Sequence, residues 1–307
     1  MMTYIAKRLI QMIPVGIGVT FFVFSILFLT PGDPARIMAG EHATSEVVEQ
    51  WREALGLNDP FLVQYGRYLG RLVQGDLGEC IRTGRPVANA IFDSRFFITF
   101  QVAALGTSVS MFLGIIIGII QATRRNSFVD IGLMFTTLTL MSIPTFWLGL
   151  ILINFFAVSH RILPVAGWGT LAQAVMPIMT LATGASATVA RMTRASMIEV
   201  LDQDYIRTAY AKGLAERKVI YKHALRNALI PVVTLVGLQF GGLLTGAIIT
   251  ETVFAINGMG RLTIEAIRNQ NFPVAQSGIL IFALIFMLVN LIVDITYRLL
   301  NKRIELT

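Results

Sequence analysis

Long apolar stretches alternate with short polar segments along almost the whole chain. A bilayer core about 30 Å thick is crossed by about 20 helical residues, and six stretches reach that length. They are Leu9–Leu29, Phe97–Ile120, Val129–Val158, Leu171–Ala190, Pro231–Val253 and Val274–Tyr297. The pattern therefore predicts an all-α integral membrane protein with six transmembrane helices.

Two of these stretches need separate comment. Lys7 and Arg8 precede the first, as in a secretory signal sequence, but Leu9–Leu29 is long enough to span and no Ala-x-Ala site follows. We therefore expect it to stay as the first helix. The third stretch would be about 45 Å long as one straight helix, so we expect it to tilt, to protrude or to bend, with Pro144 as the candidate bend.

The basic residues between the stretches indicate the orientation. Positive charges favour the cytoplasmic side of a membrane protein, and alternate connections are basic. These are Lys7 and Arg8, Arg124 and Arg125, the Arg191 to Arg226 loop, and Arg298, Lys302 and Arg303. Both termini are thus predicted to be cytoplasmic, and the segment from Pro31 to Arg95 is external.

The external segment has the pattern of two amphipathic helices. Thr44 or Ser45 can cap the first, whose apolar stripe ends at Gly56. The second follows Pro60 and ends at Gly75. We expect both helices to pack at the outer mouth of the membrane part.

The cytoplasmic stretch from Arg191 to Pro231 is too polar to span and predicts helix, break, helix. Asp202 or Asp204 can cap a short helix that stops at Gly213, and a second runs from about Glu216 to Asn227. We expect four apolar or aromatic side chains to be exposed there: Tyr205, Ile206, Tyr210 and Leu214. Such a surface favours a partner groove, although a merely connecting, solvated loop is the alternative.

Composition narrows the class further. Hydrophobic residues make up 55% and charged residues 14% of the chain, and the net charge of +7 is dispersed between apolar runs rather than gathered as on a nucleic-acid surface. One cysteine, Cys80, permits no internal disulfide, and no Cys/His cluster accompanies the three histidines. We expect no bound metal and no nucleic-acid partner.

Several short motifs, taken in order, carry a family resemblance. They include Pro31-Gly-Asp-Pro34, Gly75-Asp-Leu-Gly78, Ser142-Ile-Pro-Thr-Phe-Trp147, Arg191-Met-Thr-Arg-Ala-Ser-Met197, Asp204-Tyr-Ile-Arg-Thr-Ala-Tyr-Ala-Lys-Gly213, Glu251-Thr-Val-Phe254, Gly258-Met-Gly-Arg261 and Phe272-Pro-Val274. The chain resembles permeases of binding-protein-dependent ABC importers, more narrowly the dipeptide, oligopeptide, glutathione and nickel family. Arg207 and Thr208 depart from the general permease motif, which narrows the branch to the peptide type.

The resemblance implies a complex and a division of the chain. The complex would contain a second homologous permease, as a heterodimer, two cytoplasmic ATPase subunits and an extracytoplasmic solute-binding protein. The divisions would be a first helix (1–30), an extracytoplasmic helical insertion (31–96) and a permease core (97–307) with the coupling loop 191–230. The chain has no Gly-x-x-x-x-Gly-Lys-Ser/Thr phosphate loop, so we expect no cofactor on it, with ATP and Mg bound by the partners.

The resemblance also implies which residues act. Coupling to the ATPase falls on Asp204, Tyr205, Ile206, Arg207, Thr208, Ala209, Tyr210, Ala211, Lys212, Gly213 and Leu214. For the translocation pathway we select polar or small residues within the spans: Ser142, Gln239, Gly242 and Thr245. Ordinary hydrogen bonds between helices explain such neutral residues equally well. Gly237, Gly241, Gly242 and Gly246 form small-xxx-small patterns that permit close helix packing.

Other function classes fit the pattern less well. A secondary transporter or channel would explain six spans, but no charge lies in the middle of any span to couple ions, and the cytoplasmic helix pair would have no role. An intramembrane hydrolase would need a base or metal in the bilayer, whereas His42, His160 and His223 all fall in predicted loops. We predict an importer subunit in a prokaryotic inner membrane, for peptides or for glutathione, an opine or a nickel chelate.

Overall fold

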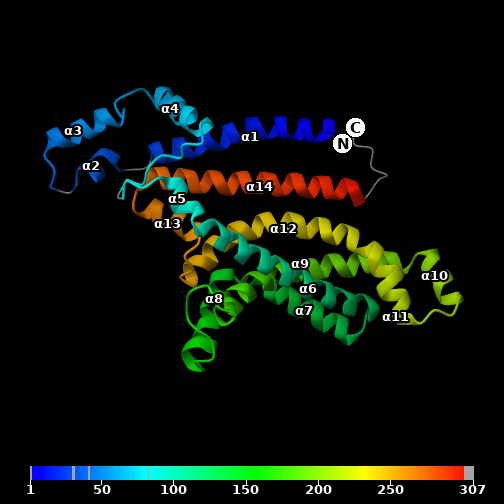
Figure 1. The fold of residues 1–307 in the computed structure, drawn as a ribbon. Coiled ribbons are helices and arrows are strands. Elements are labelled where there is room, and N and C mark those ends of the chain that lie inside the picture. Colours follow the sequence, from blue (N-terminus) through cyan, green and yellow to red (C-terminus); the bar gives the residue numbers. More distant parts are fainter. Residues whose placement is uncertain (1, 30–31, 41, 82, 301–307) are drawn as a thin grey trace. The chain divides into compact units, whose positions relative to one another are not determined.

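The structure is a computed structural model that describes residues 2–29, 32–40, 42–81 and 83–300 (Figure 1). Across these ranges the regular secondary structure is helical, apart from one isolated antiparallel bridge between Glu79 and Pro86. The chain divides into two compact units, Met1–Thr99 with Asn257–Met287 and Phe100–Ile256 with Leu288–Thr307. Each unit is described by itself.

Unit 1 contains the first helix and the predicted external insertion. Its helices are α1 (Met2–Leu29), α2 (Pro34–Ala39), α3 (Ser45–Ala54), α4 (Phe61–Val73), α5 (Val87–Phe92), α13 (Met259–Arg268) and the first part of α14 (Phe272–Leu300). One apolar core joins α1, α5, α13 and α14 through buried side chains such as Val23, Ile91, Met259 and Ala275. Helix α5 of the insertion is thereby tied to α1 and α14, the first and last helices of the chain.

The two amphipathic helices predicted in the insertion are confirmed. Gly56 and Gly75 follow α3 and α4 with φ of +63° and +79°, a backbone conformation that side chains other than glycine rarely adopt. Tyr65 and Tyr68 of α4 are buried against Phe24 of α1, and their ring centroids lie 5.6 and 5.5 Å from that of Phe24. Aromatic packing therefore fixes α4 on the C-terminal half of α1.

Unit 2 holds the remaining helices. They are most of α6 (Arg95–Thr123), α7 (Phe128–Ser142), α8 (Thr145–Leu152), the π-helical segment η1 (Ile153–Ser159), α9 (Leu171–Leu201), α10 (Asp204–Ala211), α11 (Glu216–Lys218), the π-helical segment η2 (Val219–Ala224), α12 (Leu225–Val253) and the end of α14. Helices α9 and α12, green and yellow in Figure 1, run side by side, and α7 and α8 also pack on α9. Helix α9 is thus the centre of the unit.

Four described helices are long and apolar enough to cross a membrane, and the bent pair of α7 with α8 and η1 would make a fifth. The four are Ile5–Ile26, Val87–Thr123, Glu216–Val253 and Phe272–Thr296. The bend at Pro144 is confirmed, because the two halves of the pair meet at 99° there. Helix α9 does not qualify, since many of its residues are Ala, Thr and Ser, so six spans stay a prediction.

Close helix packing occurs where α6 meets α9. A Cβ atom at Gly114 would lie 2.5 Å from Cβ of Val189, and one at Gly118 would lie 2.5 Å from Cβ of Thr193. Among the glycines predicted on α12, a Cβ at Gly237 would lie 2.4 Å from Val293, whereas one at Gly242 would meet nothing within 4 Å. Within this chain, close helix packing therefore occurs at Gly237, whereas Gly242 meets no neighbouring helix.

Candidate functional site

The predicted coupling segment forms helix α10, which ends as the sequence indicates but begins differently. Gln203, with extended backbone, is its N-cap and makes no side-chain capping bond. The predicted caps are therefore wrong: Asp202 caps the C-terminus of α9, and Asp204 is the first residue of α10, where a carboxylate favours the positive end of the helix dipole. Gly213 stops the helix with φ +73°.

Helix α10 has one inward and one outward face. Ile206 is fully buried and Ala209 is 7% exposed, whereas Tyr205 and Tyr210 are 43% and 44% exposed. The expectation that Ile206 is exposed is wrong, because its side chain is part of the core of unit 2, and Leu214 is half-buried. The remaining predicted coupling residues are exposed: Asp204, Arg207, Thr208, Ala211, Lys212 and Gly213.

The inward face joins α10 to four other helical segments. Ile206 and Ala209 share one apolar cluster with the ends of α6 and α9, with η2 and with the start of α12, through Ile119, Ala122, Met197, Val219, Ile220, Ala224 and Ala228. On the rim of this cluster, Asn227 Nδ2 donates a hydrogen bond of 2.8 Å to Tyr205 Oη. A displacement of α10 must therefore move these segments or break their packing.

The second helix of the loop continues into a long apolar helix. Its predicted start at Glu216 is confirmed, but it does not end near Asn227, because α11, η2 and α12 form one apolar span from Glu216 to Val253. Pro231, predicted as the start of the fifth span, lies inside α12. The segment that packs against α10 is therefore continuous with a spanning helix.

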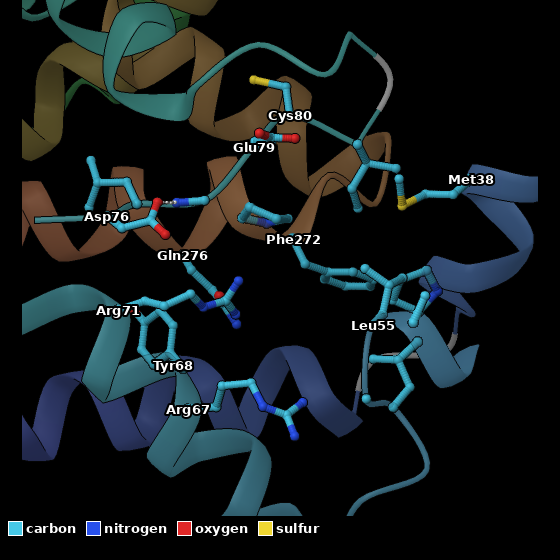
Figure 2. Close-up of a pocket in the computed structure, with 18 of the residues that line it drawn as sticks. Met38, Leu55, Arg67, Tyr68, Arg71, Asp76, Glu79, Cys80, Phe272 and Gln276 are labelled. Atoms are coloured by element: carbon cyan, nitrogen blue, oxygen red, sulfur yellow. Dashed lines mark hydrogen bonds between the residues drawn. The ribbon is translucent and has the colours of Figure 1, made fainter. Parts of the chain in front are cut away.

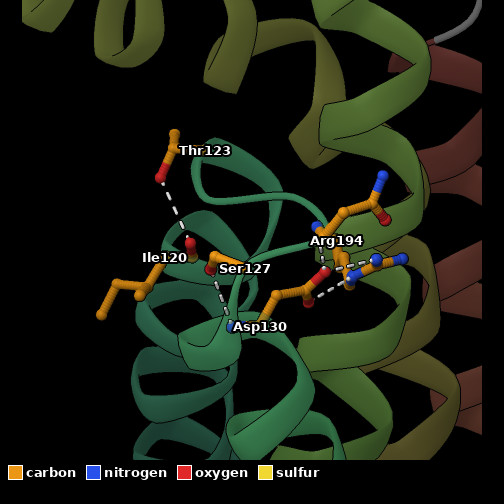
Figure 3. A network of polar contacts seen from close by, with 6 residues as sticks. Ile120, Thr123, Ser127, Asp130 and Arg194 are labelled. Atoms are coloured by element: carbon orange, nitrogen blue, oxygen red, sulfur yellow. Dashed lines mark hydrogen bonds and ion pairs between the residues drawn. The ribbon is translucent and has the colours of Figure 1, made fainter.

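An ion pair holds the start of α7 against the C-terminal part of α9 (Figure 3). Arg194 Nε and Nη2 donate to the two carboxylate oxygens of Asp130 at 2.9 and 2.7 Å, and Asn126 N donates to Asp130 Oδ2 at 3.1 Å. The Asp130 side chain is 3% exposed and that of Arg194 is 26% exposed. Ser127 caps α7 by accepting a hydrogen bond from Asp130 N at 3.2 Å.

The predicted pathway residues divide into two places. Ser142 ends α7, is exposed and donates to Leu138 O of its own helix at 3.0 Å. Gln239 lies on α12 and donates to Ala185 O of α9 at 3.5 Å, and its Oε1 is buried without a hydrogen-bond partner. Gly242 and Thr245 are exposed on α12, in one stripe at helical spacing with Leu238 and Ile249.

No metal-binding cluster accompanies these features in the described part of the chain. The described residues contain no group of three His, Cys, Asp or Glu side chains placed to hold a metal ion. His160 is exposed, and its Nδ1 lies 2.8 Å from Phe155 O. The structure instead brings together helix α10, which has one buried and one exposed face, the apolar cluster that holds its buried face, and the ion pair of Asp130 with Arg194.

Comparison with known proteins gives the family. A family described as binding-protein-dependent transport system inner membrane component matches residues 114–306, and the N-terminal family of such components matches residues 1–102. The chain is 41% identical to the dipeptide transport system permease protein DppB of Alkalihalophilus pseudofirmus, over 99% of this chain and 100% of that protein. It is 42% identical to the glutathione transport system permease protein GsiC of Escherichia coli strain K12, over 99% of both chains.

Solved structures give the fold. A chain of the inward-facing MetNI methionine ABC transporter matches with a TM-score of 0.58 and 19% identity, over 67% of this chain and 94% of that one. A chain of an amino acid ABC transporter matches with a TM-score of 0.50 and 16% identity, over 69% and 94%. The likeness covers the ABC permease fold. The chain therefore belongs to the family of binding-protein-dependent transport system inner membrane components, which are multi-pass membrane permeases.

Proposed function

We propose that this chain forms half of the translocation pathway of an ABC importer for short peptides or peptide-like solutes. It would work with a second, homologous permease as a heterodimer, two cytoplasmic ATPase subunits and an extracytoplasmic binding protein. The relatives support the solute class, since they are named for dipeptide and glutathione transport. We further propose six spans with both termini in the cytoplasm, α9 being the span that length and composition alone do not reveal.

The two-faced geometry of α10 is the observation that carries this proposal. An eight-residue helix is too short to be stable alone, and the burial of Ile206 and Ala209 in its own subunit fixes it in place. The exposed residues, among them Tyr210 and Arg207, are then presented to a partner as a preformed surface. An aromatic residue and an arginine are the types that most often dominate protein interfaces.

The same geometry gives the coupling step. ATP and Mg would bind only to the partner subunits, since this chain has no phosphate loop. Closure of the ATPase pair would displace α10, and the apolar cluster around Ile206 would pass that displacement to α6, α9 and α12 as a movement of packed helices. The ion pair of Asp130 with Arg194 would make α7 follow α9.

The pathway itself is proposed for the exposed stripe of α12. Gly242 and Thr245 stand among the apolar Leu238 and Ile249 on a face that unit 2 leaves uncovered. Such a face suits contact with the second permease or with the solute between the two chains. Gln239 beside it, with an unpaired buried oxygen, could exchange its hydrogen bonds as the helices move.

ATP hydrolysis by the complex tests the proposal. The complex, co-purified with its neighbouring subunits and placed in nanodiscs, is assayed with and without binding protein loaded with a dipeptide mixture or with glutathione. We expect stimulation by one of these solutes and a loss of about tenfold in Tyr210→Ala, as for an interface residue worth about 1.4 kcal/mol. Tyr221→Ala, which changes a tyrosine that is 54% exposed and lies outside α10, is the control. If no ATPase co-purifies and the chain alone conducts solute in liposomes, the channel class replaces the importer.

Cysteine labelling tests the orientation. Cys80 is the one cysteine of the sequence and can be replaced by serine. A new cysteine at Val73, which is 87% exposed in the insertion, should react with an impermeant maleimide from outside intact cells. A cysteine at the exposed Lys212 should react only after the membrane is opened. The reverse pattern would refute the proposed topology.

A further inference from the structure

Four cations lie on the helix that leads from α10 into the long apolar helix, and the transport mechanism above gives them no role. They form the basic stripe, which consists of Arg217, Lys218, Lys222 and Arg226 with no acid between them. All four side chains are exposed, and none forms an ion pair or a side-chain hydrogen bond with another described residue. By contrast, Arg194 and Arg207 of the same unit have carboxylate oxygens at 2.7 and 3.6 Å.

The basic stripe occupies the side of its helix that faces away from the core of unit 2. Val219, Ile220 and Ala224, which alternate with the cations, are buried in the apolar cluster that holds α10. Lys218 and Lys222 are four residues apart, and Arg226 follows after four more, which is the spacing of one helix face. Burial of the opposite face therefore fixes the direction in which the cations point.

The stripe also lies just before the apolar part of the same helix. Segments α11, η2 and α12 form one helix over Glu216–Val253, and the apolar run begins near Pro231. At about 1.5 Å per residue, the cations from Arg226 back to Lys218 lie about 8 to 20 Å before Pro231. The headgroup layer of a bilayer is about 5 to 8 Å deep, and long Lys and Arg side chains extend toward it. Lipid headgroups are thus within reach of the stripe.

The charges of the insertion have a different arrangement. Figure 2 shows Arg67 and Arg71 of α4 at a cavity that Asp76 and Glu79 also line, and Arg67 is paired with Asp59. Charges of both signs at one place largely cancel at a distance, whereas charges of one sign add. The basic stripe has the second arrangement, which suits a partner of uniform negative charge.

We propose that the basic stripe binds the headgroups of anionic phospholipids. One phosphodiester would accept charge-assisted hydrogen bonds from Arg226 and Lys222, and a second would accept them from Lys218. Clusters of four or more Lys and Arg next to a membrane helix attract anionic lipid in this way. Bound lipid would hold the helix that supports α10 at the membrane surface and would leave the exposed face of α10 free. This inference goes beyond the proposed import function and requires neither solute nor ATPase.

Native mass spectrometry of the full chain, titrated with dioleoyl-phosphatidylglycerol or with dioleoyl-phosphatidylcholine, tests the site. We expect the first phosphatidylglycerol to bind at least tenfold more tightly than the first phosphatidylcholine. The triple variant Lys218→Gln, Lys222→Gln, Arg226→Gln should lose this preference, a loss of at least tenfold in phosphatidylglycerol affinity. The matched control neutralises three exposed arginines of the insertion, Arg36→Gln, Arg71→Gln and Arg85→Gln, and should keep the preference.

Several results would overturn the proposal. Equal affinity for the two lipids excludes recognition of the anionic headgroup, and equal losses in the two triple variants show attraction by net charge alone. Competition by glycerol phosphate as strong as by the lipid indicates a site for free phosphate. Unchanged phosphatidylglycerol binding in the stripe variant, with loss of ATPase from the co-purified complex, assigns the stripe to the ATPase. The expected loss of lipid binding supports the site even if the import proposal fails, because the assay contains neither solute nor ATPase.

Discussion

Truncation of Ile206 to alanine should weaken the packing that holds helix α10 on the rest of unit 2. Ile206 is fully buried, and the cavity left by such a change costs about 2–4 kcal/mol. Because α10 has only eight residues and depends on this packing, the substitution should lower the free energy of local opening of α10 by that amount. Since about 1.4 kcal/mol changes an equilibrium constant tenfold, amide exchange in α10 should accelerate by about 30-fold to 1,000-fold.

Hydrogen exchange with mass spectrometry, on the full complex in nanodiscs, measures this effect. Ile206→Val, which removes one methylene, should give a smaller acceleration of about 2-fold to 10-fold. Tyr210→Ala on the outward face is the matched control and should leave exchange in the free permease unchanged. Equal acceleration in Ile206→Ala and Tyr210→Ala would refute the anchoring of α10 through its inward face.

The remaining predictions concern contacts between the other helices of unit 2. Arg194→Gln leaves the buried carboxylate of Asp130 unpaired and should destabilise the chain by about 3 kcal/mol, a value at the lower end for buried pairs because Arg194 is 26% exposed. The double variant with Asp130→Asn should recover most of that loss in thermal unfolding, and no recovery would contradict the pairing. Gly114→Val should lower thermal stability strongly because α9 lies against it, whereas Gly242→Ala should leave it unchanged; similar losses in both would contradict the close packing of α6 on α9.

Local features of the sequence were sufficient to predict much of the fold. Glycines at helix ends, such as Gly56 and Gly213, identify the stops because their backbone has positive φ. The amphipathic period of α4 predicts a packed helix, and its tyrosines do pack on α1. Pro144 marks the bend because a proline cannot continue the helical hydrogen bonding.

Long-range pairing could not be predicted in the same way. An apolar residue on a short helix, such as Ile206, is equally suited to its own subunit and to a partner, and only the fold decides between them. Asp130 and Arg194 are 64 positions apart, so no spacing rule connects them. Helix α9 is moderately apolar because protein covers many of its residues, including Ala182 and Thr193, and this burial is visible only in the structure.

The central claim is that α10 meets the ATPase with one face while the other stays in its own subunit. Photocrosslinking tests it directly, with benzoylphenylalanine introduced at Tyr210 in one complex and at the exposed Tyr221, outside α10, in a control. We predict a crosslink to the ATPase from position 210, strongest with ATP bound, and no crosslink to the ATPase from position 221. Crosslinks from 210 only to lipid or to the chain itself, in a complex that hydrolyses ATP, would contradict it.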